Sequence, residues 1–322
     1  MISVAIPIYN EEEIVHLLHQ RVSDVMAGID ESWEVVYVND GSKDSTLSLL
    51  LDLQALDPHV VVVDLSRNFG HVGALTAGLQ TARGDAVIIM DGDLQDPPEV
   101  IPEMVEAWRN GAQVVTTIRR SRKESRRHLA VLFSLWYRVL GMMSDFPIPL
   151  NSGIFGLLDR TALNAFNSLP EVNRYLPGVR AWIGYRTSVV YYDRDDRAAG
   201  DGKLNIASRI KYAWDGITGY SMKPIRMMSY AGAASVAFAL LFAAVLIAVS
   251  VFSNPVAAAY GTTAAVFFMG GVQMLCAGVL GEYIGRIYDQ VRQRPLSLIN
   301  HIYRAEAASA TGRDRSTVSI AA

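Results

Sequence analysis

Two aspartates, Asp91 and Asp93, stand one residue apart directly after an apolar run that ends at Met90. Like charges this close repel each other, so both carboxylates ionise most readily when a cation lies between them. Mg²⁺ and Mn²⁺ prefer oxygen ligands and bridge phosphate groups. The pair therefore predicts a site for Mg²⁺ or Mn²⁺ that also binds a diphosphate. The alternative is a polar turn after a strand.

Three further polar segments follow apolar runs, namely 9–11, 40–42 and 67–68. Glu11 favours the start of a helix through the helix dipole. Pro7 and Tyr9 could instead pack against a nucleotide base. Asp40, at the end of a strand, could accept hydrogen bonds from a base or a ribose. Ser42 or Asp44 can cap the helix that follows.

The elements that position these residues are alternating strands and helices. Apolar, β-branched runs predict strands at 3–8, 33–39, 60–65, 86–90 and 114–118, and helices are predicted at 11–29, 45–56, 70–82 and 98–110. The strands are apolar on both faces, as in a parallel sheet covered by helices. Because ligands bind at the carboxyl ends of such strands, four polar loops should meet at one edge.

The C-terminal part of the chain is apolar, without a charged residue between Met227 and Gly281. Residues 229–252 and 262–284 are each long enough to cross a bilayer, for which roughly 20 apolar residues suffice. Basic residues flank this region at both ends, whereas the connection 253–261 has no Lys or Arg. The positive-inside rule then places both ends in the cytoplasm. Two buried helices of a soluble protein are the alternative.

A basic stretch, 119–127, precedes an apolar segment, 128–143, with helical spacing. This segment is either a core helix behind a solvated charge run or a helix lying on a membrane surface. The N-terminus lacks a basic region and a cleavage site, so it is not read as a signal peptide and the first half is expected in the cytoplasm. A net charge of −3 over 322 residues does not indicate a nucleic-acid partner, and the single cysteine, Cys276, excludes an internal disulfide.

The polar loops together resemble family 2 glycosyltransferases with the GT-A fold. The matching segments are 4–11, 39–46 and 91–99. The continuation Leu94-Gln95-Asp96-Pro97-Pro98-Glu99 resembles the polyisoprenyl-phosphate glycosyltransferases, the dolichol-phosphate-mannose-synthase-like branch. Segments 67–70, 197–200 with Lys203, and 281–286 are also similar to that branch, as are the two apolar spans. The resemblance extends to Pro295.

The resemblance implies an α/β GT-A domain with a Rossmann-like, mostly parallel sheet, followed by two transmembrane helices. It implies inverting transfer of a monosaccharide from a nucleotide-sugar donor to undecaprenyl phosphate or a similar polyprenyl phosphate, for modification of cell-envelope glycans. The expected organisation is a GT-A domain (1–192), interfacial juxtamembrane helices (193–228), a membrane hairpin (229–286) and a partly disordered cytoplasmic tail (287–322). The catalytic domain would face the cytoplasm at the inner membrane, and related enzymes often form homo-oligomers.

Residue roles carry over by position. Donor binding falls to Pro7, Tyr9, Glu11, Asp40, Asp91 and Gln95, the metal to Asp91 and Asp93, and the acceptor phosphate to Arg119, Arg122 and Lys203. Asp93, Arg197 and Lys203 are the implied catalytic residues. A solvated surface run is the alternative for 119–127, and a lysine that reaches to the membrane interface is the alternative for Lys203.

Two positions depart from the family pattern. Ile154 stands where many relatives have an aspartate that is a usual candidate for the catalytic base, and Gly202 stands where many have a serine. A phosphate monoester has a second pKa of about 6, so the acceptor reaches the site ionised and needs no base. Asp159, the nearest remaining carboxylate, is read as structural at a helix start. The rivals are a non-catalytic nucleotide-sugar-binding membrane module and a polysaccharide synthase, although the Gln-x-x-Arg-Trp motif of the latter is absent.

Overall fold

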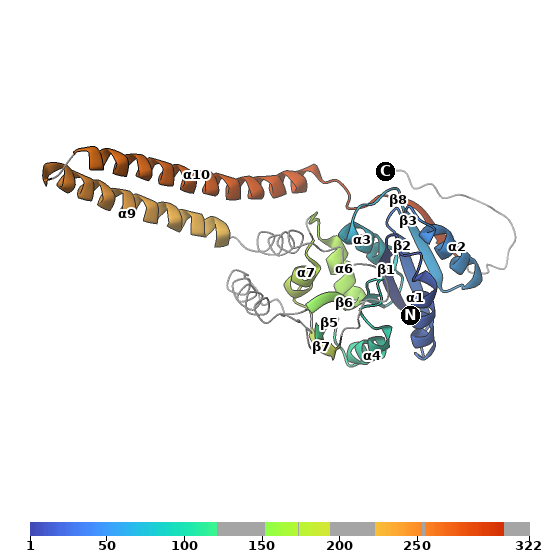
Figure 1. Cartoon of the computed structure of the whole chain (residues 1–322). Coiled ribbons are helices and arrows are strands. Elements are labelled where there is room, and N and C mark those ends of the chain that lie inside the picture. The colour runs from blue at the N-terminus through green and yellow to red at the C-terminus, as the bar shows by residue number, and fades with distance from the viewer. Residues whose placement is uncertain (121–151, 173, 194–222, 253–254, 306–322) are drawn as a thin grey trace.

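The computed structural model describes residues 1–120, 152–172, 174–193, 223–252 and 255–305 (Figure 1). Several expectations concern residues outside these ranges. They are the basic and apolar segments beyond Arg120, the site residues Arg122, Arg197 and Lys203, most of the interfacial segment, and the tail after residue 305.

The described strands form one eight-stranded sheet in the order β7-β5-β6-β4-β1-β2-β3-β8. Strands β4, β1, β2 and β3 are parallel neighbours, and β5 and β7 are parallel to each other. Strand β6 pairs antiparallel with both β4 and β5, and β8 pairs antiparallel with β3. The expected mostly parallel, Rossmann-like sheet of the GT-A type is confirmed. The strands are β1 Ile2–Ile8, β2 Trp33–Asn39, β3 Val60–Leu65, β4 Ala86–Ile89, β5 Val114–Arg119, β6 Ser152–Asp159, β7 Thr187–Tyr192 and β8 Ile299–Arg304.

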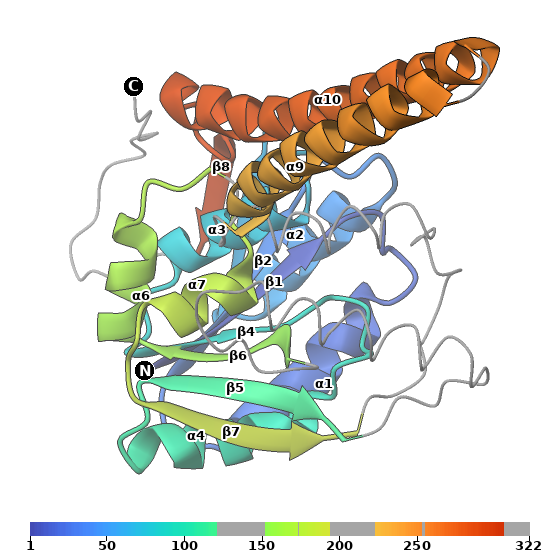
Figure 2. The same cartoon turned by 90° about the vertical axis from the view of Figure 1, so that its left-hand side faces the viewer.

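Helices cover both faces of the sheet (Figures 1 and 2), and alternate residues of strands β1 to β4 pack into different cores. In β1, Val4 and Ile6 pack in the core under α1 and α4, whereas Ala5 packs against α3. Burial on both faces explains why most residues of these strands are apolar, on both faces. The helices of the globular part are α1 Val15–Ala27, α2 Thr46–Leu56, α3 His71–Thr81, η1 Pro98–Val100, α4 Ile101–Arg109, α6 Arg160–Ser168 and α7 Leu176–Trp182.

The first five strands lie within one residue of their predicted bounds. The first helix begins at Val15 rather than at residue 11, because the preceding residues form a loop in which Asn10 has a φ of 51°. Strand β8 was not predicted. It pairs antiparallel with β3, whose sequence lies more than 230 residues earlier, and its short sequence has little alternation of polar and apolar residues.

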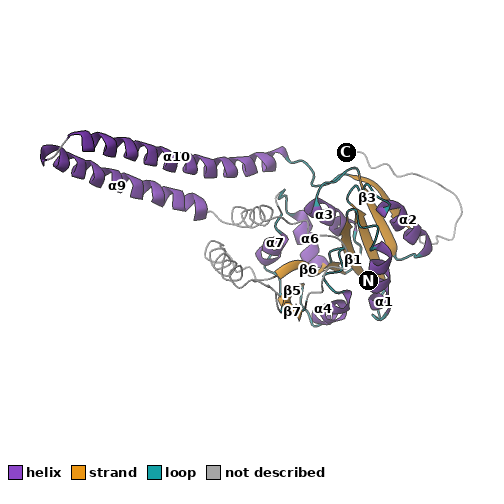
Figure 3. Ribbon diagram, viewed as in Figure 1, coloured by secondary structure: helices purple, strands orange, loops and turns teal. Residues whose placement is uncertain are grey.

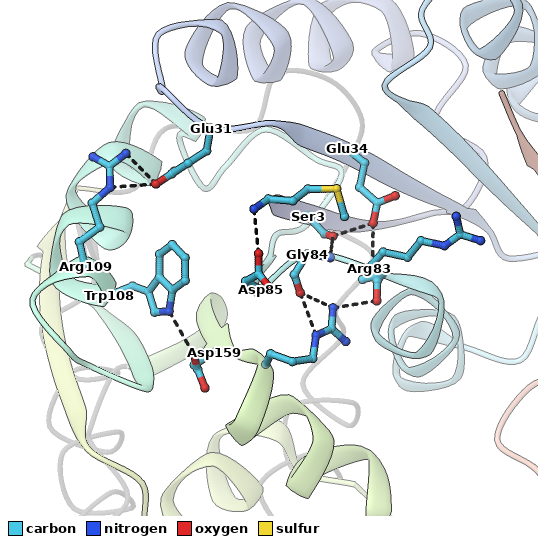
Figure 4. Close-up of polar contacts among 12 residues, drawn as sticks. Ser3, Glu31, Glu34, Arg83, Gly84, Asp85, Trp108, Arg109 and Asp159 are labelled. Atoms are coloured by element: carbon cyan, nitrogen blue, oxygen red, sulfur yellow. Dashed lines mark hydrogen bonds and ion pairs between the residues drawn. The ribbon is translucent and has the colours of Figure 1, made fainter. Parts of the chain in front are cut away.

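A polar network ties together the edge of the sheet where the parallel strands begin (Figure 4). The Glu34 carboxylate is 5% exposed and accepts hydrogen bonds from Ser3 Oγ and the Arg83 backbone N–H, both at 2.7 Å. Arg304 Nη1, from β8, donates to the other Glu34 oxygen at 2.6 Å. The Arg160 Nε donates to the Gly84 carbonyl at 2.9 Å. The N-terminal edge is thus held by structural contacts, which leaves the carboxyl edge to the polar loops.

Two long helices, α9 Lys223–Phe252 and α10 Pro255–Arg292, lie side by side and project from the globular part (Figures 1 and 3). Within each of the segments Met228–Val245 and Gly261–Arg292, an 18-residue stretch has a mean hydropathy of 1.8, and none of its described residues is buried. Both are long and apolar enough to cross a membrane. The base of α10 contacts the globular part, where Gln290 Nε2 donates to the Pro170 carbonyl at 2.8 Å and its oxygen accepts from the Val172 N–H at 3.1 Å.

Candidate functional site

The loops that follow β1 and β2 are joined by hydrogen bonds at the carboxyl edge of the sheet. The backbone N–H of Asn10 donates to Ser42 Oγ at 3.1 Å, and the Asn10 side-chain oxygen accepts from the Lys43 N–H at 2.8 Å. Glu11 N–H donates to Thr46 Oγ1 at 3.0 Å. These bonds fix the backbone at Asn10 and Glu11, directly after Tyr9, and both Tyr9 and Glu11 are half-buried.

Asp40 connects the loop after β2 to the loop after β3. Its carboxylate is 3% exposed and accepts the backbone N–H groups of Phe69 at 2.7 Å and Gly70 at 3.0 Å. Burial raises the pKa of Asp40, outweighing these two bonds. Gly41 has a φ of +64°, and a Cβ there would lie 2.5 Å from the Arg67 carbonyl carbon. The two loops therefore approach closely only because residue 41 is glycine. The predicted contact of Asp40 with base or ribose stays a prediction.

A chain of amides and a buried carboxylate underlies these loops. Asp64, 8% exposed, accepts Asn39 Nδ2 at 2.7 Å and, from β8, Asn300 Nδ2 at 3.1 Å. Asn39 in turn accepts the Ser42 N–H at 3.2 Å. Sequence reasoning missed this role of Asp64 and Asn300, because nothing local in the sequence brings β8 beside β3.

Asp91 and Asp93 follow β4 at the same edge. A Cβ at Gly92 would lie 2.6 Å from Ile8 Cδ1, so glycine lets the turn pack on β1. Asp91 Oδ1 lies 3.4 Å from Nε2 of His71, the first residue of α3, and Asp93 Oδ1 accepts the Gln95 N–H at 3.2 Å. The four loops thus converge at one edge, as expected. The position of His71 at a helix start after a polar loop was the only sequence signal for its proximity to Asp91.

A second buried cluster joins this turn to the far strands β5 and β7. The Tyr192 hydroxyl donates to Asp96 Oδ1 at 2.6 Å and accepts from Arg119 Nε at 3.0 Å, and Arg119 Nη2 lies 3.7 Å from the same Asp96 oxygen. Burial lowers the pKa of Arg119, but the bond with Tyr192 and the charges of Asp96 and Asp91 outweigh it, so the pKa is raised. Arg119 therefore stays charged beside the aspartate turn.

Strand β6 places Ile154 and Asp159 at opposite edges of the sheet. Ile154 is half-buried beyond the end of β4, and its carbonyl accepts Arg180 Nη1 at 3.2 Å. Asp159 pairs in register with Ala86, at the start of β4. Its carboxylate accepts the Thr161 N–H at 2.7 Å and caps α6. The reading of Asp159 as a structural residue at a helix start is confirmed, and the residue lies at the edge opposite to the loops.

Asp91 and Asp93 suit a metal ion whose remaining ligands come from a bound substrate and water. Within the described ranges, no three His, Cys, Asp or Glu side chains form a group that could hold a metal ion. Mg²⁺, however, is commonly bound by one or two carboxylates together with substrate phosphates and water. Asp91 and Asp93, separated by a buried glycine, fit that arrangement. Pro7 is buried in β1, and Gln95 is half-buried in the same loop as the two aspartates.

Comparison with known proteins gives matches along nearly the whole chain. The model of glycosyl transferase family 2 matches residues 3–166. A bactoprenol glucosyl transferase of Shigella phage SfII is 39% identical over 304 residues, which cover 94% of this chain and 98% of the phage protein. An uncharacterized glycosyltransferase of Synechocystis sp. is 40% identical over 306 residues, covering 95% of this chain and 96% of that protein.

A solved mannosyltransferase from Pyrobaculum calidifontis, in complex with GDP-Man and Mn²⁺, aligns over 90% of this chain and 86% of its own, with a TM-score of 0.41 and 18% identity. A likeness of this degree carries no conclusion about activity.

Proposed function

The chain belongs to glycosyl transferase family 2, and on that premise we propose that it transfers a monosaccharide, with inversion, from a nucleotide sugar to a polyprenyl phosphate such as undecaprenyl phosphate. The observation that carries this proposal is the match over 94% of this chain to a protein named bactoprenol glucosyl transferase, since bactoprenol is a polyprenyl lipid. That match includes the apolar hairpin as well as the sheet. The product would serve to modify cell-envelope glycans.

On the donor side, Pro7, Tyr9, Glu11 and Asp40 would hold the base and ribose, and Gln95 would face the sugar. Their positions on loops joined by hydrogen bonds at one edge of the sheet support this assignment. Asp91 and Asp93 would bind Mg²⁺ or Mn²⁺ with the diphosphate. When bound, such a cation offsets the charge that develops on the departing diphosphate.

On the acceptor side, the chain needs cations rather than a base. A lipid phosphate is largely ionised at neutral pH, so the nucleophile carries no proton that must be removed. The side chain of Ile154 could not accept one. Two phosphate-bearing substrates repel each other, and Arg119, at the end of β5, would offset that repulsion together with Arg122, Arg197 and Lys203.

The hairpin of α9 and α10 determines where we propose that the protein resides. We place α9 and α10 across the cytoplasmic membrane with both ends and the catalytic domain in the cytoplasm, because the acceptor resides in the bilayer. The proposed units are a catalytic domain 1–192, an interfacial segment 193–228, the hairpin 229–286 and a cytoplasmic tail 287–322, whose strand β8 joins the sheet of the catalytic domain. A homo-oligomer is proposed as well.

The test is transfer from radiolabelled UDP-, GDP- and dTDP-sugars to undecaprenyl phosphate in detergent with Mg²⁺ or Mn²⁺. The expected result is an acid-labile, lipid-soluble product with one donor, lost in Asp93→Ala and on adding EDTA. Asp24→Ala, which changes an exposed aspartate of α1, is the matched control and should keep full activity. Donor binding without any product would instead favour the non-catalytic binding module, and a polymeric product would favour a polysaccharide synthase.

A further inference from the structure

We propose that Tyr192 and Asp96 are positioning residues that hold the Arg119 guanidinium toward a substrate phosphate. This inference rests on the proposed function and extends it to Tyr192, which lies outside the matching segments, and to Asp96, which lies within segment 91–99 but has no role assigned to it above. The phosphate belongs either to the donor diphosphate or to the lipid acceptor, which share the same chemistry.

The three side chains form a chain of hydrogen bonds from Asp96 through Tyr192 to Arg119, which we call the relay. Tyr192 donates its hydroxyl hydrogen to Asp96 at 2.6 Å, so the hydroxyl oxygen is left to accept from Arg119 Nε, which it does at 3.0 Å. Asp96 is fully buried and Tyr192 is 3% exposed, whereas the Arg119 side chain keeps 21% exposure. The buried members therefore fix the inner side of the guanidinium and leave its outer part accessible.

The hydroxyl can act in this way over the whole working pH range. Burial and the neighbouring Asp96 carboxylate raise the pKa of Tyr192, so it stays a neutral donor. Tyr192 is also held from the other side, because its ring packs edge-to-face on Phe155 at 5.5 Å between centroids. A fixed hydroxyl gives the arginine a fixed anchor.

The direction of the guanidinium is limited by β6 and by the aspartate turn. A Cβ at Gly153 would lie 3.0 Å from Arg119 Nη2, so the absence of a side chain there leaves room for the arginine. Arg119 Nη2 lies 3.7 Å from Asp96 Oδ1, in the loop that carries Asp91 and Asp93, so the guanidinium lies beside the proposed diphosphate site. Asp96, three residues after Asp93, thus links the proposed metal-binding turn to the Arg119 guanidinium.

The experiment is a double-mutant cycle on the full-length protein in detergent. Tyr192→Phe, Arg119→Ala and the double variant are compared with wild type by kcat and by the KM of each substrate. Residues that orient a metal-binding side chain by hydrogen bonding typically contribute a factor of about 10 to 100 in affinity or activity. Tyr192 orients Arg119 in a comparable way, so Tyr192→Phe should lower kcat/KM by about that factor. If Tyr192 acts through Arg119, the same change in the Arg119→Ala background should alter kcat/KM by less than about 2-fold. Tyr191→Phe, at the adjacent and 51% exposed position, is the matched control and should match wild type.

Each result has a defined meaning. A rise in the KM of the nucleotide sugar with Tyr192→Phe assigns Arg119 to the donor diphosphate, and a rise in the KM of the polyprenyl phosphate assigns it to the acceptor. Equal losses from Tyr192→Phe in both backgrounds would overturn the proposal, because they indicate a general structural role. Wild-type activity in Tyr192→Phe would do the same.

The cycle is repeated on the binding of inorganic pyrophosphate with Mn²⁺, measured by calorimetry. This second readout remains available if the wild-type protein makes no product, so failure of the proposed function stays distinct from failure of the relay. Asp96→Asn, which keeps the side-chain shape, replaces Tyr192→Phe if the latter does not fold. The same non-additivity with Arg119→Ala is then expected, and additive binding losses would contradict the relay.

Discussion

Asp40 has two roles that a substitution can test. Its carboxylate accepts hydrogen bonds from the loop after β3, and it is predicted to contact the base or ribose of the donor. In the folded chain both carboxylate oxygens accept backbone N–H groups of the loop after β3, at 2.7 and 3.0 Å. Asp40→Ala leaves those two donors without their acceptor, in a place where Asp40 itself is 3% exposed. We therefore expect the variant to lose stability as well as affinity for the donor.

The magnitude follows from the two bonds. Each buried donor left unsatisfied costs about 1–3 kcal/mol, so the loss lies at about 2–6 kcal/mol before compensation. Burial of the carboxylate is itself unfavourable, as its raised pKa indicates, and its removal offsets part of the loss. A net loss of about 2–4 kcal/mol corresponds to a fall in Tm of about 4–16 °C for a domain of this size.

The assay is thermal unfolding of the detergent-solubilised protein, followed by circular dichroism, together with the Kd of the nucleotide-sugar donor. Asp52→Ala, at an exposed aspartate of α2, is the control and should change stability by no more than about 0.5 kcal/mol. Asp40→Asn, which retains one acceptor oxygen, should fall between wild type and Asp40→Ala. If Asp40→Ala keeps the wild-type Tm but loses donor binding, the two loop bonds have no stabilising role and our reasoning is refuted.

Three further changes test other parts of the structure. Arg304→Ala leaves the buried Glu34 carboxylate without its cation and should lower the free energy of unfolding by about 3–5 kcal/mol, measured by thermal unfolding. Arg109→Ala, at a half-exposed ion pair, is the control and should lower it by about 0–1 kcal/mol. Equal losses would contradict the assigned burial. Asp159→Ala removes the cap of α6 and should cost about 0.5–2 kcal/mol at pH 7. The Asp159 pKa is lowered because its hydrogen bonds outweigh burial, so this difference should be present above the ordinary pKa of about 3.9 and be lost as the pH falls through the lowered value. Gly41→Ala, at a φ of +64°, should lower Tm and donor affinity together, and an unchanged Tm would show that the two loops can separate without loss.

Much of the fold could be predicted because it depends on local pattern. Strands 33–39 and 60–65 are rich in valine, with three valines in the first and residues 60–63 all valine in the second, and both occur at the predicted residues. Strand β8 could not be predicted in this way, because an edge strand with exposed residues carries little hydrophobic pattern. Its pairing with β3 depends on the path of α10 back to the sheet.

For the candidate site, sequence order could identify polar residues but not their partners. Asp91 and Asp93 were recognisable from their position after a strand, and topology then brings them beside the other loops. The partners of Asp40 are backbone N–H groups, which no side-chain motif records. The expected roles of Arg122, Arg197 and Lys203 remain predictions.

The sequence by itself determined the alternation of strands and helices, the apolar hairpin and the edge of the sheet at which the polar loops meet. These properties follow from periodicity and from the rule that parallel strands place their carboxyl ends together. Only the tertiary structure decided that Tyr192, Asp96 and Arg119 form one cluster, and that Asn300 reaches Asp64. The hydrogen bond between Tyr192 and Asp96 joins residues 96 positions apart, and such contacts arise only when the packed strands fix the distance between them.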